Sequence, residues 1–348
     1  MRIEYTLKIK LSGWIYWTKV GVGVLLLIII YNNINETESV FAVLKDANPF
    51  YFFISLMLLI PHVFIAFLKW RYLLRTRFAD ISIRETLGSL FFGITLGMVT
   101  PGNLGELGRG LFFQNRNKMI VTGLTVLDKL SNMLVISTLG FLSICLILFN
   151  QPDWQTDWAI VSAIAGAALL AALWVSLVKG EWIRRLLAKI SQRYPNNSQL
   201  QAFMDAFVHI RQKDVFTILG LTLLWFVVIT FQYHVLITGF THIDLIQSFQ
   251  GVTAAIFTKM LLPISFGGLG IREGVTVFYF SLFEISRAAV FNASLIIFLI
   301  NFILPAIAGF YYLIQLNGRN RKAKSIPIMP EPAADSLEQA ELSGKIQK

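Results

Sequence analysis

The sequence has little of what soluble enzymes and secreted proteins depend on. Only 14% of its 348 residues are charged, and it holds four histidines and one cysteine, Cys145. A single cysteine excludes a disulfide framework. The histidines are too scattered along the chain for the spacing of a zinc site. We therefore predict no bound metal and no cofactor.

Signatures of nucleotide binding and hydrolysis are also missing from the sequence. It has no G-x4-G-K-S/T loop, so we predict that any transport is not driven by ATP. It has no H-E-x-x-H, no G-x-S-x-G and no aspartate-rich metal motif. The sequence therefore nominates no catalytic residue, and we predict that the protein is not an enzyme.

Apolar residues dominate what is present. The chain is 55% hydrophobic, and several runs approach the roughly 20 residues that cross a bilayer as a helix. We predict an all-α polytopic membrane protein with about six full spans and two re-entrant helical hairpins, arranged as an inverted repeat. The predicted spans are 11–31, 50–70, 120–149, 158–178, 215–239 and 288–316, in a membrane domain of residues 1–316 with halves 11–149 and 158–316.

The basic residues give this topology a direction. The net charge is +10, but the lysines and arginines lie beside apolar runs, so we predict no nucleic-acid binding. In the predicted topology, 24 of the 30 lysines and arginines fall on one side. We therefore predict that both termini, the connector 179–214 and a disordered tail 317–348 are cytoplasmic, in a cell's cytoplasmic membrane.

One motif, P-x3-G-x-L-G, occurs twice inside apolar stretches. Proline and glycine break helices, and bare backbone at membrane depth survives only where protein or a water-filled cavity covers it. Paired breaks in two halves of a chain point to the binding site of a transporter built from repeats. The predicted site residues are Pro101, Gly105, Glu106 and Arg109 in the first copy and Pro263, Gly267, Gly268, Gly270, Arg272 and Glu273 in the second.

The two arginines suggest an anionic ligand. Arg109 and Arg272 carry forked donors that suit a phosphate. Glu106 and Glu273 would pair with them in the empty site or carry a coupling proton. The alternative is that each Arg and Glu only clasp the hairpins together. The duplication favours a binding role.

Three more charged residues lie inside or beside apolar runs. Asp128 and Lys129 are early in the span 120–149, where they form either a local pair or a third element of the site. We include both in the predicted substrate site. Lys259 precedes Pro263 by one turn and either faces a cavity or extends to the membrane surface.

These motifs resemble those of the flippase-like membrane domain found in lysylphosphatidylglycerol synthases and as a stand-alone protein. The first signature is similar to Pro101 through Arg109, the second to Thr125 through Leu130, and the third to Pro263 through Glu273. The resemblance covers about residues 10–316. Lys129 stands where the family usually has Arg, and Asn301 where it often has Arg.

The resemblance implies translocation of a lipid across the cytoplasmic membrane. It does not imply aminoacyl transfer, which belongs to a separate soluble domain that we do not expect in this chain. A cationic cavity that opens to lipid suits an anionic phospholipid or a polyprenyl phosphate. Two alternatives stay open: an intramembrane lipid-modifying enzyme and a non-transporting partner of such an enzyme. As protein partners, we consider a second copy of the chain or a lipid-modifying enzyme.

Overall fold

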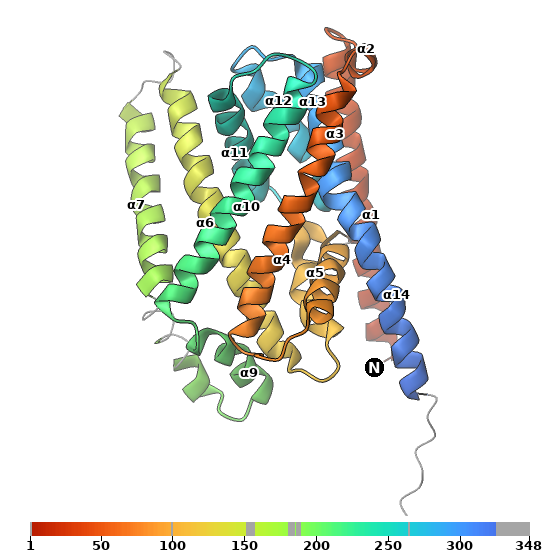
Figure 1. Ribbon diagram of the computed structural model, residues 1–348, viewed down its shortest axis with the longest axis vertical. Coiled ribbons are helices and arrows are strands. Elements are labelled where there is room, and N and C mark those ends of the chain that lie inside the picture. The colour runs from red at the N-terminus through yellow and green to blue at the C-terminus, as the bar shows by residue number, and fades with distance from the viewer. Residues whose placement is uncertain are drawn as a thin grey trace, which may run out of the picture. The chain divides into compact units, whose positions relative to one another are not determined.

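The computed structural model describes residues 2–98, 100–150, 157–179, 185, 189–263 and 265–324. The described residues form helices and no strands (Figure 1). The chain divides into a unit Met1–Phe310 and a unit Tyr311–Lys348. Helix α14 (Leu304–Lys324) continues beyond residue 316, and the predicted tail lies outside the described residues from 325 onward. The following description concerns the first unit.

The predicted all-α membrane architecture is confirmed. Five helical segments are long and apolar enough to cross a membrane. They are Trp17–Asn35 of α1 (Arg2–Asn35), Pro49–Arg75 of α3 (Pro49–Met57) and α4 (Leu59–Arg75), Lys118–Phe149 (α6), Gln212–Thr238 (α10), and Arg287–Ile314 of α13 (Arg287–Phe298), η4 (Leu299–Ile303) and α14. The span predicted at 158–178 corresponds to α7 (Asp157–Lys179), whose apolar stretch, Ile160–Ser176, is shorter.

Two pairs of shorter helices contain the repeated motifs. The first pair is α5 (Ile83–Met98) and η1, a 3₁₀ helix over Pro101–Phe112. Ser82 and Glu85 start α5 with a capping box, in which each backbone N–H donates to the other's side chain at 3.0 and 3.1 Å. The second pair is α11 (Leu245–Leu261) and α12 (Ile271–Ser281), joined through the short turn η3 (Phe266–Gly268).

The two pairs begin at opposite ends of the unit. The base of the first pair lies at the end where Arg77 pairs with Asp205 of α9 (Ser198–Val208). The base of the second lies near α2 (Val40–Lys45), where Ser286 Oγ donates to Glu38 Oε2 at 2.6 Å. Figure 1 shows α9 at the lower end and α2 at the upper end. The first tip (residues 100–109) and the second tip (262–273) meet inside the unit, where η1 contacts η3.

Packing around the tips is dense on the inside and apolar on the outside. Trp70, Leu73 and Leu124 are fully buried in the cluster beside the first pair, and Phe280 is fully buried beside the second. On α7, Ile164 is 65% exposed, as is expected of a side chain that faces lipid. Apolar side chains both in the interior and on the exterior are typical of a helical membrane bundle.

Candidate functional site

The first tip packs closely against α5 because its glycines lack side chains. A Cβ at Gly105 would lie 2.1 Å from the carbonyl oxygen of Leu96. The same contact lets Gly105 N–H donate to Thr100 Oγ1 at 2.6 Å. A Cβ at Gly93 would meet the side chain of Arg109 at 2.4 Å, so α5 also leaves room for that arginine. The close packing fixes the tip where its charges reach neighbouring helices.

Arg109 is the centre of a buried ionic network. Its Nη2 lies 3.0 Å from Glu106 Oε2, and its Nη1 lies 2.9 Å from Asp128 Oδ2 on α6. Asp128 also binds Lys69 Nζ of α4 at 2.8 Å. Lys129 Nζ lies 3.4 Å from Glu106 Oε2. The network therefore ties η1 to α4 and α6, and it collects four of the predicted site residues.

Neighbouring groups position the cationic side chains of Arg109 and Lys69. The guanidinium of Arg109 lies over the ring of Trp70, 4.7 Å from its centroid. Lys69 Nζ donates to Asn132 Oδ1 at 2.6 Å. Asn132 lies one turn after Asp128 on α6, so both face the same lysine. Arg109, Asp128 and Lys69 are each only 4% exposed.

The second tip turns the chain through left-handed backbone. Gly267, Gly268 and Gly270 have φ angles of +58°, +75° and +80°, which side chains disfavour. Gly270 N–H then donates to Glu273 Oε2 at 2.7 Å and caps the start of α12. Pro263, just after the end of α11, stands before this turn. The geometry of the turn thus comes from glycine, proline and one carboxylate.

Arg272 forms a local pair at the second tip. Its Nε donates to Glu273 Oε1 at 2.9 Å and to Ser294 Oγ of α13 at 3.3 Å. Its guanidinium lies over the ring of Phe298, 4.4 Å from the centroid. Glu273 is fully buried. The second predicted pair therefore exists, but its carboxylate also serves as a helix cap.

The structure brings the predicted residues into two clusters. Glu106, Arg109, Asp128 and Lys129 form one, and Arg272 with Glu273 forms the other. Lys259 is within electrostatic range of Glu106 and of the second pair. Pro101 begins η1, although its side chain lies outside the described residues, as does Ile264 entirely.

Sequence reasoning missed Lys69 as a member of the site. Lys69 falls near the end of the predicted span 50–70 and was not assigned to the site, but α4 continues to Arg75 and keeps the lysine inside the bundle. The signal that could have found it is its position between Leu68 and Trp70 in an apolar run, since a buried carboxylate needs a cation. Asn301, at the position where the family often has Arg, lies in the π-helical turn η4 and donates from its side-chain amide to Gln232 Oε1 at 2.6 Å.

A second charged cluster holds the base of the first pair. Arg116 Nη1 donates to Asp80 Oδ1 at 3.0 Å, and its Nε donates to Glu85 Oε1 at 2.9 Å. The hydrogen bond from Arg116 lowers the pKa of Asp80 below its ordinary value of 3.8. The hydrogen bonds to Asp80 and Glu85 raise the pKa of Arg116. This cluster is a clasp at the end of the unit rather than part of the interior network.

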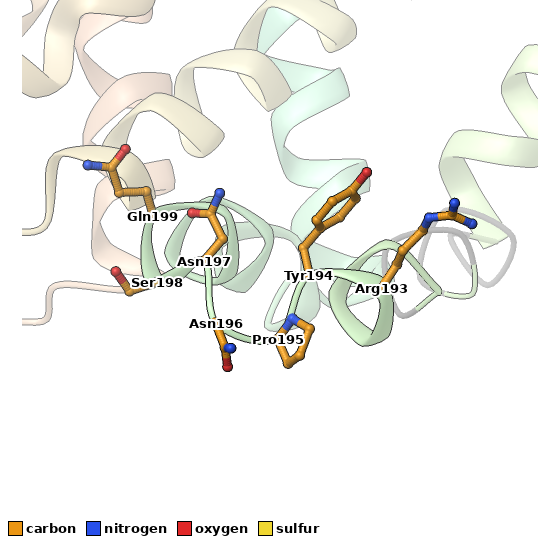
Figure 2. A pocket seen from close by; sticks show the side chains of 7 residues that line it. All are labelled: Arg193, Tyr194, Pro195, Asn196, Asn197, Ser198 and Gln199. Carbon is orange, nitrogen blue, oxygen red and sulfur yellow. The ribbon is translucent and has the colours of Figure 1, made fainter.

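A surface depression of about 610 Å³ lies at the turn before α9 and is lined by Arg193, Tyr194, Pro195, Asn196, Asn197, Ser198 and Gln199. Figure 2 shows Arg193 and Tyr194 on one side of the turn, and Pro195 and Asn196 on the other. Its side chains diverge and only one of them is charged. We therefore place the candidate site at the tips and not at this turn.

The fold and the buried charges together define a polytopic membrane protein with ionised residues in its interior. Residues 16–309 match the family described as "Lysylphosphatidylglycerol synthase TM region". The chain therefore belongs to this family. A search of curated proteins found no match, and a search of solved structures found none either.

Proposed function

We propose that this protein moves an anionic lipid across the cytoplasmic membrane without ATP, with the two helix pairs as re-entrant hairpins. The observation that carries the proposal is the meeting, inside one bundle, of two charged tips whose bases lie at opposite ends. A site between such tips can be approached from either face in turn, as alternating access requires.

The depth of the network suits the middle of a bilayer. Asp128 is ten residues after Lys118, the first residue of α6. At about 1.5 Å per residue this places Asp128 about 15 Å along the helix. The hydrocarbon core of a bilayer is about 30 Å thick. Ionised residues at that depth are costly and typically belong to a transport path.

The charge balance favours an anion. Around the two tips the described residues include five cations and three carboxylates, namely Lys69, Arg109, Lys129, Lys259 and Arg272, with Glu106, Asp128 and Glu273. An excess of two positive charges in a low dielectric attracts a negatively charged head group. Among the described residues each of the three carboxylates contacts a cation, so none is set apart as a nucleophile, which supports transport rather than catalysis.

The family supports a role in lipid handling, and the basic bias of the sequence supports cytoplasmic termini. Cysteine labelling in intact cells tests the topology. We expect a cysteine near Asn103 to react from the cytoplasm and one near Phe266 from outside. A cysteine at Ser198 that reacts with an impermeant reagent from outside would contradict the proposed orientation.

Transport itself is tested in proteoliposomes with a fluorescent phosphatidylglycerol and an impermeant quencher. We expect wild-type protein to expose the inner-leaflet lipid to the quencher. The double variant Arg109→Ala with Glu106→Gln retains the Lys69–Asp128 pair, so we expect it to fold and to fail in transport. Arg287→Gln, an exposed change at the other end, is the matched control. No transport by wild type would refute the function. Full transport by the double variant would refute a role for Arg109.

A further inference from the structure

Lys259 lies at the junction of the two tips. It lies in the last turn of α11, three residues before the C-cap residue Leu262 and one turn before Pro263. Its side chain runs along the second tip, because a Cβ at Gly268 would lie 2.9 Å from Lys259 Cε and 3.3 Å from Cδ. The ammonium is within electrostatic range of Arg272 and Glu273, and also of Glu106 from the first tip. The charge of Lys259 therefore interacts electrostatically with residues of both tips.

Lys259 differs from the other cations of the site in having no partner within the part of the chain that the structure describes. Arg109 contacts two carboxylates, Lys69 contacts Asp128, Lys129 contacts Glu106, and Arg272 contacts Glu273. Among the described residues, none makes an ion pair or a hydrogen bond with the ammonium of Lys259. The residue as a whole is half-buried rather than fully enclosed. An unpaired ammonium with three donors at this depth strongly favours an anionic ligand.

We propose that Lys259 binds the phosphate of the transported lipid. This inference rests on the proposed function and names the contact within it. A free phosphate has the same chemistry, but the next residues favour a lipid. Leu261 is 59% exposed and Leu262 is 40% exposed. They place apolar surface within one turn of the ammonium, where acyl chains can lie.

Lipid binding tests this role without requiring transport. Wild type, Lys259→Gln, Lys259→Arg and Lys118→Gln would be purified with equal amounts of phosphatidylglycerol and diacylglycerol, and bound lipid counted by native mass spectrometry. Lys118 is exposed at the start of α6 and is the matched loss of one charge. We expect Lys259→Gln to lower phosphatidylglycerol binding about tenfold, as the loss of one charged hydrogen-bonding group does, without changing diacylglycerol binding. Lys259→Arg and Lys118→Gln should bind as wild type does.

Two further measurements separate the explanations. Millimolar inorganic phosphate should leave phosphatidylglycerol bound to wild type; its displacement would identify free phosphate as the ligand and overturn the assignment to lipid. Lys259→Gln removes a charge that has no partner among the described residues, so its melting temperature without lipid should be no lower than that of wild type. A lower melting temperature, or unchanged phosphatidylglycerol binding, would overturn the role of Lys259.

The two proposals can fail separately. If wild type does not transport lipid but binds phosphatidylglycerol through Lys259, the proposed function fails and the binding site stands. If wild type transports lipid and Lys259→Gln binds and transports it equally well, the function stands and this inference is wrong.

Discussion

The glycines of the first tip make room for a neighbouring backbone, whereas those of the second tip turn the chain. Gly105 sits against Leu96, and only Asn103 in that copy has a positive φ, of 56°. Gly267, Gly268 and Gly270 all have left-handed backbone. One sequence pattern thus serves two physical needs, close approach in one copy and chain reversal in the other.

The charges of the two tips differ in the same way. Arg109 shares carboxylates with Lys69 and Lys129 and links three elements. Arg272 pairs with the next residue, Glu273, which also caps α12. A network with several partners can exchange one ion pair for another, whereas the second pair is held to the backbone by its carboxylate. The ion pairs of the first tip can therefore rearrange more readily than the pair of the second tip.

Among the changes that test the difference between the two tips, Gly105→Ala should lower folding stability the most. The added Cβ would meet the Leu96 backbone at 2.1 Å, and a backbone contact cannot be relieved by a rotamer change. We expect a loss of about 4 kcal/mol or more in folding stability, or no folded protein. Thermal unfolding in detergent measures it. The control is Gly220→Ala on α10, where nothing lies within 4 Å of the new Cβ; that change should stabilise the helix by up to about 1 kcal/mol. Equal effects at both positions would contradict the close packing.

Asp128→Asn tests whether the first network depends on its shared carboxylate. Both Lys69 and Arg109 would lose a charged partner at a position that is 4% exposed. We expect a loss of about 3–5 kcal/mol. Glu106→Gln is the matched change. Its side chain is 17% exposed, and Arg109 would retain Asp128, so we expect a smaller loss of about 1–2 kcal/mol. Unfolding of the two purified variants should rank them in this order, and the reverse order would place the centre of the network at Glu106.

Sequence reasoning located both tips because Gly, Pro and charge inside an apolar run are local signals. Asp128 and Lys129 were found in the same way, by their position in a span. Lys69 was not, because its pairing depends on how α4 packs against α6, and no local pattern records that packing. The difference between the tips was also hidden, since a glycine needed for space and a glycine needed for positive φ are the same letter. For the same reason the repeat predicted equivalent roles for Arg109 and Arg272. In the structure Arg109 belongs to a network with several partners, whereas Arg272 pairs with Glu273.

Gly267 offers a way to separate backbone shape from space. At φ +58° an alanine is strained, and its Cβ would lie 3.2 Å from Phe302 Cε1. We expect Gly267→Ala to cost about 1–2 kcal/mol. Gly267→Asn should cost less than alanine, because asparagine adopts the left-handed region more readily. At Gly105 the order should reverse, since the larger side chain meets the same backbone. Melting temperatures of the four variants test this order. If asparagine lowers the melting temperature more than alanine at both positions, Gly267 is not required for its positive φ.

Asp80→Asn should have the smallest effect, because Asp80 is exposed in the clasp at the base of the first pair. The hydrogen bond from Arg116 lowers the pKa of Asp80 in the folded protein below the ordinary 3.8. The clasp therefore contributes stability above that ordinary value, and the contribution is lost as the pH falls through the lowered pKa.

We expect Asp80→Asn to melt slightly below wild type at pH 7, and the difference to shrink as the pH falls below 3.8. Asp46→Asn is the control, since Asp46 is exposed and the described residues show no ion pair for it. Melting curves of both variants between neutral and acid pH measure the effect. A difference at Asp80 that stays constant with pH would contradict an electrostatic contribution from Asp80. Arg116 would then hold the base of the first pair through Glu85 alone.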